Sequence, residues 1–351
     1  MRHPHCNLVV VVALALSCGS QPRPRVAEVA DDFAGLRAVD PIDAHTHVFG
    51  VDPGVMSVIE AANMRFLDIE YLPTNDRDLF RRTHDAAASI VATHRRRAAL
   101  AVTFDAYDYG TPDFAEKVVA DLERAFADGA VAVKIWKTIG MEVKRPDGSF
   151  LMPDDPGLEP IYAVIAKHDR TLIIHAAEPD SCWEPPNPTS PDHDYYVRNP
   201  EWYMYGRSDH PSKATILEAR DRVLARHPNM RIVLAHLGSL ETRFDDLRKT
   251  LDTYRNAAVD TASRMTYLTL QPREVARAFL LQYQDRVIYG SDLDWRKGDR
   301  AWRERYASEW KYLATDDVFV YGGREVRGLA LPAEVLRKIY RTNAERWFPG
   351  M

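Results

Sequence analysis

The chain has 351 residues, 46% of them hydrophobic, enough to bury a large core in one domain with insertions or in two domains of average size. Lys and Arg number 46 against 51 Asp and Glu, a formal net charge of -5, which excludes the basic surplus typical of nucleic-acid-binding proteins. We therefore expect a small-molecule partner and no nucleic acid.

Residues 1–18 have the pattern of an export signal. A basic start is followed by the apolar run 8–16, which is too short for a permanent membrane helix but matches a cleaved leader. Ser17 and Cys18, followed by Gly19, resemble a bacterial lipoprotein cleavage box, in which the cysteine becomes lipidated. We expect a lipoprotein of the bacterial cell envelope, anchored through Cys18. The alternative is ordinary export with cleavage a few residues later, which would leave a periplasmic or secreted protein.

Residues 19–38 lack strong periodicity and are expected to form a tether between the anchor and the folded domain. Besides Cys6 and Cys18, which belong to the leader region, the chain has only Cys182. No disulfide framework is therefore expected. No local base accompanies Cys182, and we assign it no chemistry.

From Val39 onward, short apolar runs alternate with amphipathic stretches of helical length. The expected strands are 42–47, 64–72, 98–107, 131–136, 171–177, 231–237, 256–263 and 286–292, and helical stretches include 76–96, 113–129, 244–256 and 273–285. The strands are rich in Val, Ile and Leu, as parallel strands covered by helices on both faces are.

Eight such units predict an α/β fold, a (β/α)8 TIM barrel over residues 39–351, with a long insertion after the fifth strand. A doubly wound open sheet is the alternative on rhythm alone. It is disfavoured because no glycine-rich phosphate loop follows the first strand, which instead carries His-Thr-His.

Histidines and an aspartate lie at the ends of four expected strands. His45 and His47 are two apart on the first strand, so their side chains point to the same side and can share one ion. His175, His236 and Asp292 each end an apolar run. Since barrel active sites lie at the carboxyl ends of the strands, all five residues are expected at one rim. Their spacing, with that of Lys134, fits strand–helix units of roughly 31 residues if loops are inserted before and after His175, and it assigns the residues to strands 1, 4, 5, 6 and 8.

The stretch DAHTH on the first strand, together with the strand-ending histidines and aspartate, resembles the amidohydrolase superfamily. The sequences HLG at 236–238, YGSD at 289–292 and IYRTNAERWF at 339–348 are similar to its amidohydrolase-related (amidohydrolase 2) branch. The resemblance implies a metal-dependent hydrolase, an enzyme whose ion is held by His45, His47, His175 and Asp292. His236 would ligate a second ion or contact substrate.

The resemblance also implies a role for Lys134, because a carboxylated lysine on the fourth strand bridges the ions of two-metal members. A salt-bridged or substrate-binding lysine is the alternative, and Lys137 competes for the role. We expect one or two ions. Zinc is favoured by three imidazoles and a carboxylate, with other divalent ions as alternatives.

The expected reaction is hydrolysis of an amide, ester or lactone by metal-activated water, with Asp292 as the base and His236 helping to polarise the carbonyl. The same branch implies an alternative, nonoxidative decarboxylation of an aromatic or unsaturated acid, for which Arg207 or Arg264 would bind the carboxylate. A surface binding protein on an inactive barrel is the alternative of another class. Trp136 and Lys137 are further candidates for contact with substrate.

Overall fold

The computed structural model describes residues 31–48, 52–72 and 76–351. The expected leader at 1–18 and most of the expected tether lie outside these residues, so the lipid anchor and export stay predictions. The described barrel belongs to one unit, Asp32–Met351. Within the described ranges, no helix has both the length and the apolar character needed to cross a membrane.

Nine strands form the central sheet, in the order β8-β7-β6-β5-β4-β3-β2-β1-β9. They are β1 (Ile42–His47), β2 (Arg65–Ile69), β3 (Ala98–Val102), β4 (Ala132–Ile135), β5 (Thr171–Ile174), β6 (Ile232–Leu234), β7 (Ala257–Asp260), β8 (Val287–Ile288) and β9 (Leu293–Asp294). All neighbouring strands in this sheet are parallel. Each expected strand is present. β1 has the expected bounds, and the others are shorter because only the central residues of each apolar run pair with neighbours.

The last expected strand, 286–292, is divided between β8 and a turn that leads into β9. The Ala44 amide donates to the Tyr289 carbonyl at 3.0 Å, and the Asp292 amide donates to the His45 carbonyl at 2.8 Å. The chain from β8 to β9 thus runs along β1, while β8 pairs with β7 on its other side. These contacts close the parallel sheet, which confirms the expected barrel class.

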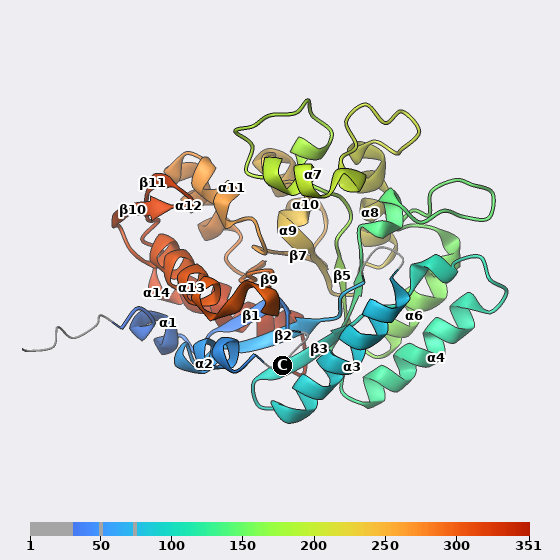
Figure 1. Ribbon diagram of the computed structural model, residues 1–351, viewed down its shortest axis with the longest axis horizontal. Helices are drawn as coiled ribbons and strands as arrows, with labels where there is room; N and C mark the ends of the chain where they lie inside the picture. Colours follow the sequence, from blue (N-terminus) through green and yellow to red (C-terminus); the bar gives the residue numbers. More distant parts are fainter. Residues whose placement is uncertain (1–30, 49–51, 73–75) are drawn as a thin grey trace, which may run out of the picture. The chain divides into compact units, whose positions relative to one another are not determined.

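Helices surround the strands, with α3, α4 and α6 on one side of the sheet in Figure 1. The longer ones are α2 (Pro53–Ala61), α3 (Arg77–Thr93), α4 (Phe114–Ala127), α6 (Glu159–Lys167), α8 (Lys213–Arg226), α10 (Phe244–Thr253), α12 (Arg273–Gln282) and α13 (Gly298–Ala314). The shorter ones are α1 (Ala34–Ala38), α5 (Thr138–Met141), α7 (His193–Arg198), α9 (Ala235–Gly238), α11 (Met265–Leu270), α14 (Ala333–Arg337) and α15 (Asn343–Trp347).

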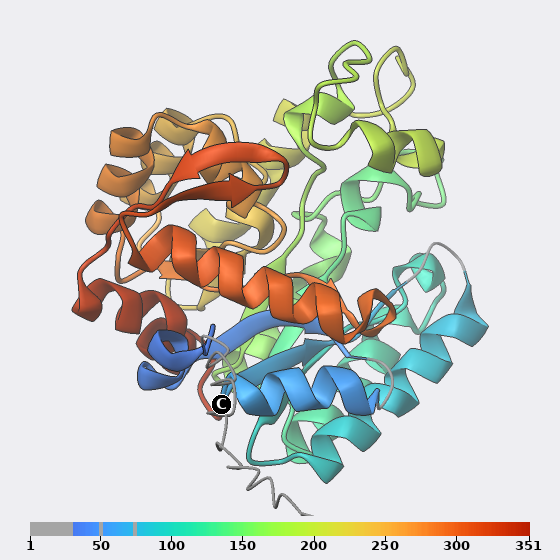
Figure 2. The ribbon, with the colours of Figure 1, turned by 60° about the vertical axis from the view of Figure 1, so that its left-hand side comes forward.

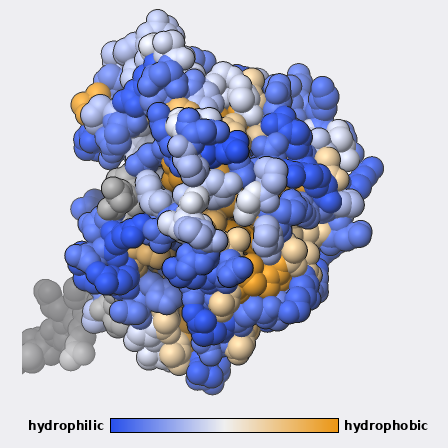
Figure 3. Space-filling model, turned by 90° about the vertical axis from the view of Figure 1, so that its right-hand side faces the viewer, coloured by the Kyte–Doolittle hydropathy of each residue, from blue (hydrophilic) through white to orange (hydrophobic). Residues whose placement is uncertain are grey.

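The core has two layers, as expected for strands buried on both faces. Small and branched residues that alternate along the strands, such as Ala44, Ala101 and Val233, fill the inside of the barrel. A larger cluster lies between the strands and the helices. On the outer face in Figure 3, hydrophilic residues surround smaller hydrophobic areas.

The folded unit begins before Val39, earlier than expected. Phe33 and Leu36 are fully buried in the core cluster, and α1 includes the last residues of the expected tether. A helix of five residues is too short to show a helical periodicity in the sequence.

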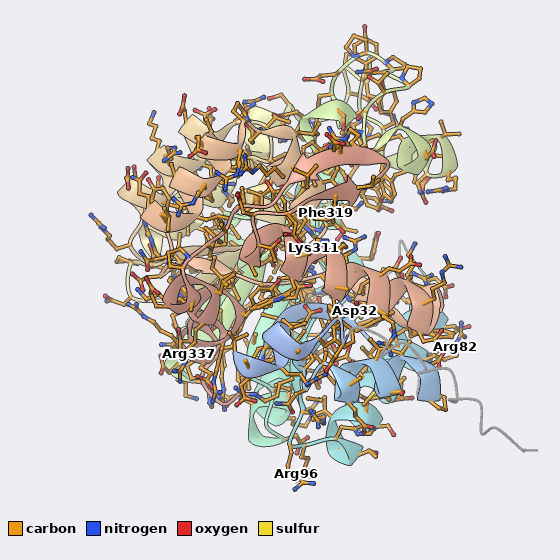
Figure 4. All side chains as sticks on the ribbon, turned by 90° about the vertical axis from the view of Figure 1, so that its left-hand side faces the viewer. Asp32, Arg82, Arg96, Lys311, Phe319 and Arg337 are labelled. Atoms are coloured by element: carbon orange, nitrogen blue, oxygen red, sulfur yellow. The ribbon has the colours of Figure 1, made fainter. Side chains whose placement is uncertain are left out.

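Two excursions leave the barrel. The chain between β5 and α8, residues 175–212, contains α7 and lies beyond the ends of β5 and β7 at the top of Figure 1. It occupies the place where the long insertion was expected. A hairpin of β10 (Val318–Tyr321) and β11 (Arg324–Arg327) crosses near α13 in Figure 2. There the Lys311 ammonium lies 5.1 Å from the centre of the Phe319 ring, and both residues are labelled in Figure 4.

Candidate metal centre

The two histidines of β1 each have one ring nitrogen committed to the protein. His47 Nδ1 lies 2.8 Å from the Ile69 carbonyl oxygen, which can only accept, so Nδ1 carries the proton. His45 Nδ1 lies 2.8 Å from Asp260 Oδ2. The second nitrogen of each ring, Nε2, therefore keeps its lone pair, and both Nε2 atoms lie close to Asp292 Oδ1, at 3.4 Å from His45 and 3.2 Å from His47.

His236 follows β6 in a turn with unusual backbone geometry. Its φ is 60°, in the left-handed region that L-residues rarely adopt. The conformation is held because the His236 amide donates to Asp260 Oδ1 at 2.7 Å. His236 Nδ1 donates to the Ala262 carbonyl at 2.9 Å, which leaves Nε2 as a potential ligand atom.

Asp292 also has a positive φ, 61°, between β8 and β9. Its amide is tied to the His45 carbonyl at 2.8 Å, and its Oδ2 accepts from Ser263 Oγ at 2.7 Å. The left-handed backbone at His236 and at Asp292 thus directs each of these side chains toward the end of β1. Hydrogen bonds to neighbouring strands hold both turns in this conformation.

His45, His236 and Asp292 form the compact group that could hold an ion, with ligand atoms all within 4.8 Å of one another. His47 adjoins the group through Asp292. His175 is buried, its ring centre 4.2 Å from that of His236, and neither of its nitrogens has a hydrogen-bond partner among the described residues. The structure therefore brings all five rim residues together. The most compact group contains His236, whereas His47 and His175, which were expected to hold the ion with His45 and Asp292, lie outside that group.

Burial sets the protonation of this centre. Burial lowers the pKa of His45 and lowers those of His175 and His236 well below the usual range. Neighbouring positive charges contribute, so these imidazoles are neutral. Burial alone would raise the pKa of Asp292. Its contacts with His47, His236 and His45 outweigh burial and keep the pKa well below its usual range. Neutral imidazoles beside an ionised carboxylate are what a divalent cation requires.

Asp260, at the end of β7, was missed by the sequence reasoning. It is buried and contacts two members of the compact group, the His45 ring through Oδ2 and the His236 amide through Oδ1. A carboxylate that orients a ligating imidazole is a common outer-shell partner in metal sites. The signal that could have found it is the one that found Asp292, an aspartate that ends an apolar strand.

Lys134 lies on β4, fully buried, with Nζ 2.8 Å from His45 Nε2. Burial lowers its pKa to about 8, although the carboxylates of Asp292 and Asp260 raise it. The lysine is therefore at the centre, as expected, and reaches the nitrogen that a metal would take. Its carboxylation stays a prediction.

The four residues proposed to contact substrate are in different environments. The Trp136 ring lies near both His47 and His175, 5.6 and 6.3 Å from their ring centres. Lys137 forms a buried ion pair with Glu178. These residues border the centre.

Arg264 is also buried, and its charge lowers the pKa of both His175 and His236. Arg207 instead donates to the backbone carbonyls of Pro200 and Glu201, at 2.9 and 3.1 Å, in the β5–α8 excursion. The structure thus brings Arg264, but not Arg207, into the electrostatic surroundings of the centre.

Comparisons with known proteins agree with this geometry. A family model described as amidohydrolase matches residues 42–350. A 2,6-dihydroxybenzoate decarboxylase from Rhizobium is similar in structure, with a TM-score of 0.53 and 16% identity over 87% of this chain and 98% of that chain. A 4-oxalomesaconate hydratase from Rhodopseudomonas palustris has a TM-score of 0.50 and 12% identity over 88% of this chain and 96% of that chain. No curated protein sequence matches the chain.

The two structural likenesses, at such low identity, concern the fold alone. The family model, however, spans the barrel from β1 to the C-terminal residues and includes every residue of the candidate centre. The chain therefore belongs to the amidohydrolase family, the family of metal-dependent, hydrolase-like TIM-barrel enzymes that its strand-end histidines resemble.

Proposed function

We propose that the protein hydrolyses an amide, ester or lactone bond of a small molecule with the help of a divalent cation, zinc being the favoured ion. The observation that carries the proposal is the convergence of three Nε2 lone pairs, from His45, His47 and His236, on the carboxylate of Asp292 at the rim of the barrel. Export to the bacterial cell envelope, with Cys18 as lipid anchor, is part of the proposal and rests on the leader alone.

The residues fit a divalent cation. Neutral imidazoles and one carboxylate are the donor set that zinc prefers, and the two nitrogens of His175 are buried polar atoms without a partner among the described residues. When bound, such an ion polarises a carbonyl oxygen and lowers the pKa of a water molecule to ~7. One ion would be held by His45, His236 and Asp292, and His47 and His175 are further candidate ligands. Lys134, if carboxylated, would complete the site of a second ion.

The chain itself supplies the proton transfers and the orientation. Asp292 would accept the proton of the attacking water at Oδ1 and pass it to the leaving group, while Ser263 holds Oδ2 still through its 2.7 Å hydrogen bond. Asp260 keeps the His45 ring in the required tautomer. Trp136, beside His47 and His175, would exclude water from one side of the reacting bond.

Nonoxidative decarboxylation is the second candidate. The similar structure from Rhizobium is a 2,6-dihydroxybenzoate decarboxylase, and a further similar structure, with a TM-score of 0.51, holds 2,6-dihydroxybenzoate itself. The presence of Arg264 near the centre favours an acidic substrate for either reaction. Because the same ligands can serve both, the reaction must be separated by its product.

The test is a substrate panel with two readouts. Protein loaded with zinc, and in parallel with manganese, would be incubated with lactones, amides, esters and aromatic carboxylic acids. Hydrolysis would be followed by acid release and decarboxylation by carbon dioxide. We expect hydrolysis that a chelator abolishes, and that Asp292→Asn lowers at least ~100-fold. Carbon dioxide release without hydrolysis, or full turnover by Asp292→Asn with metal bound, would overturn the proposal.

A further inference from the structure

Arg264 is a buried cation with few protein partners. It follows Ser263, the residue that holds Asp292, in the turn between β7 and α11, and only 6% of its surface is exposed. A guanidinium has five N–H donors, and burying it is costly unless they are satisfied. Such a group needs an explanation.

The described residues leave most of these donors unused. The guanidinium donates from Nη1 to the Ser263 carbonyl at 3.1 Å, whereas Nε has no hydrogen-bond partner there. No carboxylate oxygen of the described chain lies within the 4.0 Å of an ion pair. The Tyr267 ring is its other neighbour, 5.8 Å from the guanidinium carbon to the ring centre. Among the described residues, the Arg264 guanidinium therefore has the Ser263 carbonyl as acceptor but no carboxylate, and its Nε is unpaired.

Glu241 and Asp192 are the protein anions that could compete for it. Both carboxylates, with Asp292, raise the pKa of Arg264 against the effect of burial, so they act on it at a distance. Both have contacts of their own. Glu241 Oε1 accepts from the Asp180 amide at 2.7 Å, and Asp192 Oδ2 accepts from Ser181 Oγ at 2.7 Å. Neither closes an ion pair with the guanidinium.

The partner that fits is an oxyanion with a single charge. A planar guanidinium binds carboxylate and phosphate oxygens in pairs. A phosphate dianion would bring two negative charges into a region that already holds Asp292 and Glu241, and the nearby Lys137 is engaged by Glu178. A guanidinium without an ion pair among the described residues, close to the three carboxylates of Asp292, Glu241 and Asp192, favours a carboxylate, which has a single charge.

We propose that Arg264 is a specificity-determining residue that receives a carboxylate of the substrate beside Asp292 and His236. The inference rests on the proposed function, because it places this carboxylate at the same site as the reacting bond. It restricts the amide, ester or lactone substrates to those that also carry an acid group. For the second candidate reaction, the acid group is the one that is lost.

The test measures binding rather than turnover. Zinc-loaded protein would be titrated by calorimetry with benzoate, with benzamide, which has the same shape without the charge, and with inorganic phosphate. We expect benzoate to bind at least ~10-fold more tightly than benzamide. Arg264→Gln should weaken benzoate about 10–100-fold, the effect of losing a charge-assisted hydrogen bond, and leave benzamide unchanged. Arg207→Gln is the matched control and should change neither affinity.

The variants keep the test decisive. Melting temperature and zinc content would be measured first. If Arg264→Gln does not fold, Arg264→Lys replaces it, and an affinity for benzoate about tenfold lower supports the assignment, because a lysine lacks the paired donors. A benzoate affinity within threefold of wild type in the folded variant overturns it, as does phosphate that binds more tightly than benzoate through Arg264. Failure of the hydrolysis panel leaves this binding result standing, so the two proposals fail separately.

Discussion

The rim of the barrel and the β5–α8 excursion hold polar side chains by opposite means. At the rim, backbone and strand contacts fix His45, His236 and Asp292. They include hydrogen bonds from the His236 amide to Asp260 and from the Asp292 amide to the His45 carbonyl. In the excursion, buried ion pairs hold Glu178 and Asp180. Their partners are Lys137 and Lys213, which lie outside the excursion. Strands place chemistry at a fixed point, whereas an excursion needs charges to tie it to the barrel.

The difference predicts that changes at the rim affect chemistry and spare the fold. His236→Ala removes a member of the compact group, and we expect zinc affinity to fall by more than the ~100-fold seen for outer-shell changes, with activity falling to background. Equilibrium dialysis with metal analysis measures the affinity. His94→Ala, at the end of α3, is the matched control and should bind zinc as wild type does. Normal zinc content in His236→Ala would remove this residue from the centre.

Changes in the excursion should have the reverse effect. Asp180 Oδ1 lies 2.8 Å from Lys213 Nζ and 3.1 Å from an Arg243 nitrogen. Asp180→Asn leaves the Lys213 ammonium buried without this counter-charge, and we expect a loss of about 3 kcal/mol of unfolding free energy. Urea denaturation measures it. Zinc affinity should change less than threefold, and a large change there would contradict the separation of the two regions.

The ion pair of Asp180 with Lys213 also makes the unfolding free energy depend on pH. Burial would raise the pKa of Asp180, but Lys213, Thr242 and Arg243 outweigh burial and lower it below the usual value. A carboxyl with a depressed folded pKa contributes stability above its unfolded pKa of about 3.9, and this contribution is lost as pH falls through the lower folded value. Unfolding free energies of wild type and Asp180→Asn should therefore converge below about pH 4. A difference that stays constant down to pH 2 would exclude this origin.

Asp260 lies outside the compact group and supports two of its members, so changing it should have an effect of intermediate size on zinc affinity. Asp260→Asn keeps the size of the side chain but weakens its hold on the His45 ring and the His236 amide. We expect zinc affinity to fall about 10–100-fold, with the melting temperature close to wild type. If affinity is unchanged, the two strained turns keep their geometry without Asp260, and its role is packing.

The two regions also differ in how far they could be predicted from sequence. A residue that ends an apolar strand of a barrel must lie at the rim, so His175, His236 and Asp292 could be placed without coordinates. The left-handed turns at His236 and Asp292, which decide how closely the ligands approach, leave no pattern in the sequence. Neither does the pairing of charges in the excursion, because it joins residues far apart in the chain.

The two arginines show this limit most clearly, and they supply the prediction with the smallest expected effect. Arg207 and Arg264 are equal candidates in the sequence, but Arg207 donates to two carbonyls in the excursion, whereas Arg264 lies buried near the centre. Arg207→Ala loses two partly exposed hydrogen bonds, so we expect about 1 kcal/mol of lost stability and less than a twofold change in kcat/KM on a carboxylate-bearing substrate. Denaturation and steady-state kinetics measure the two. A KM raised tenfold with kcat unchanged would mean that the excursion moves and brings Arg207 to the substrate, so that both regions build the binding site.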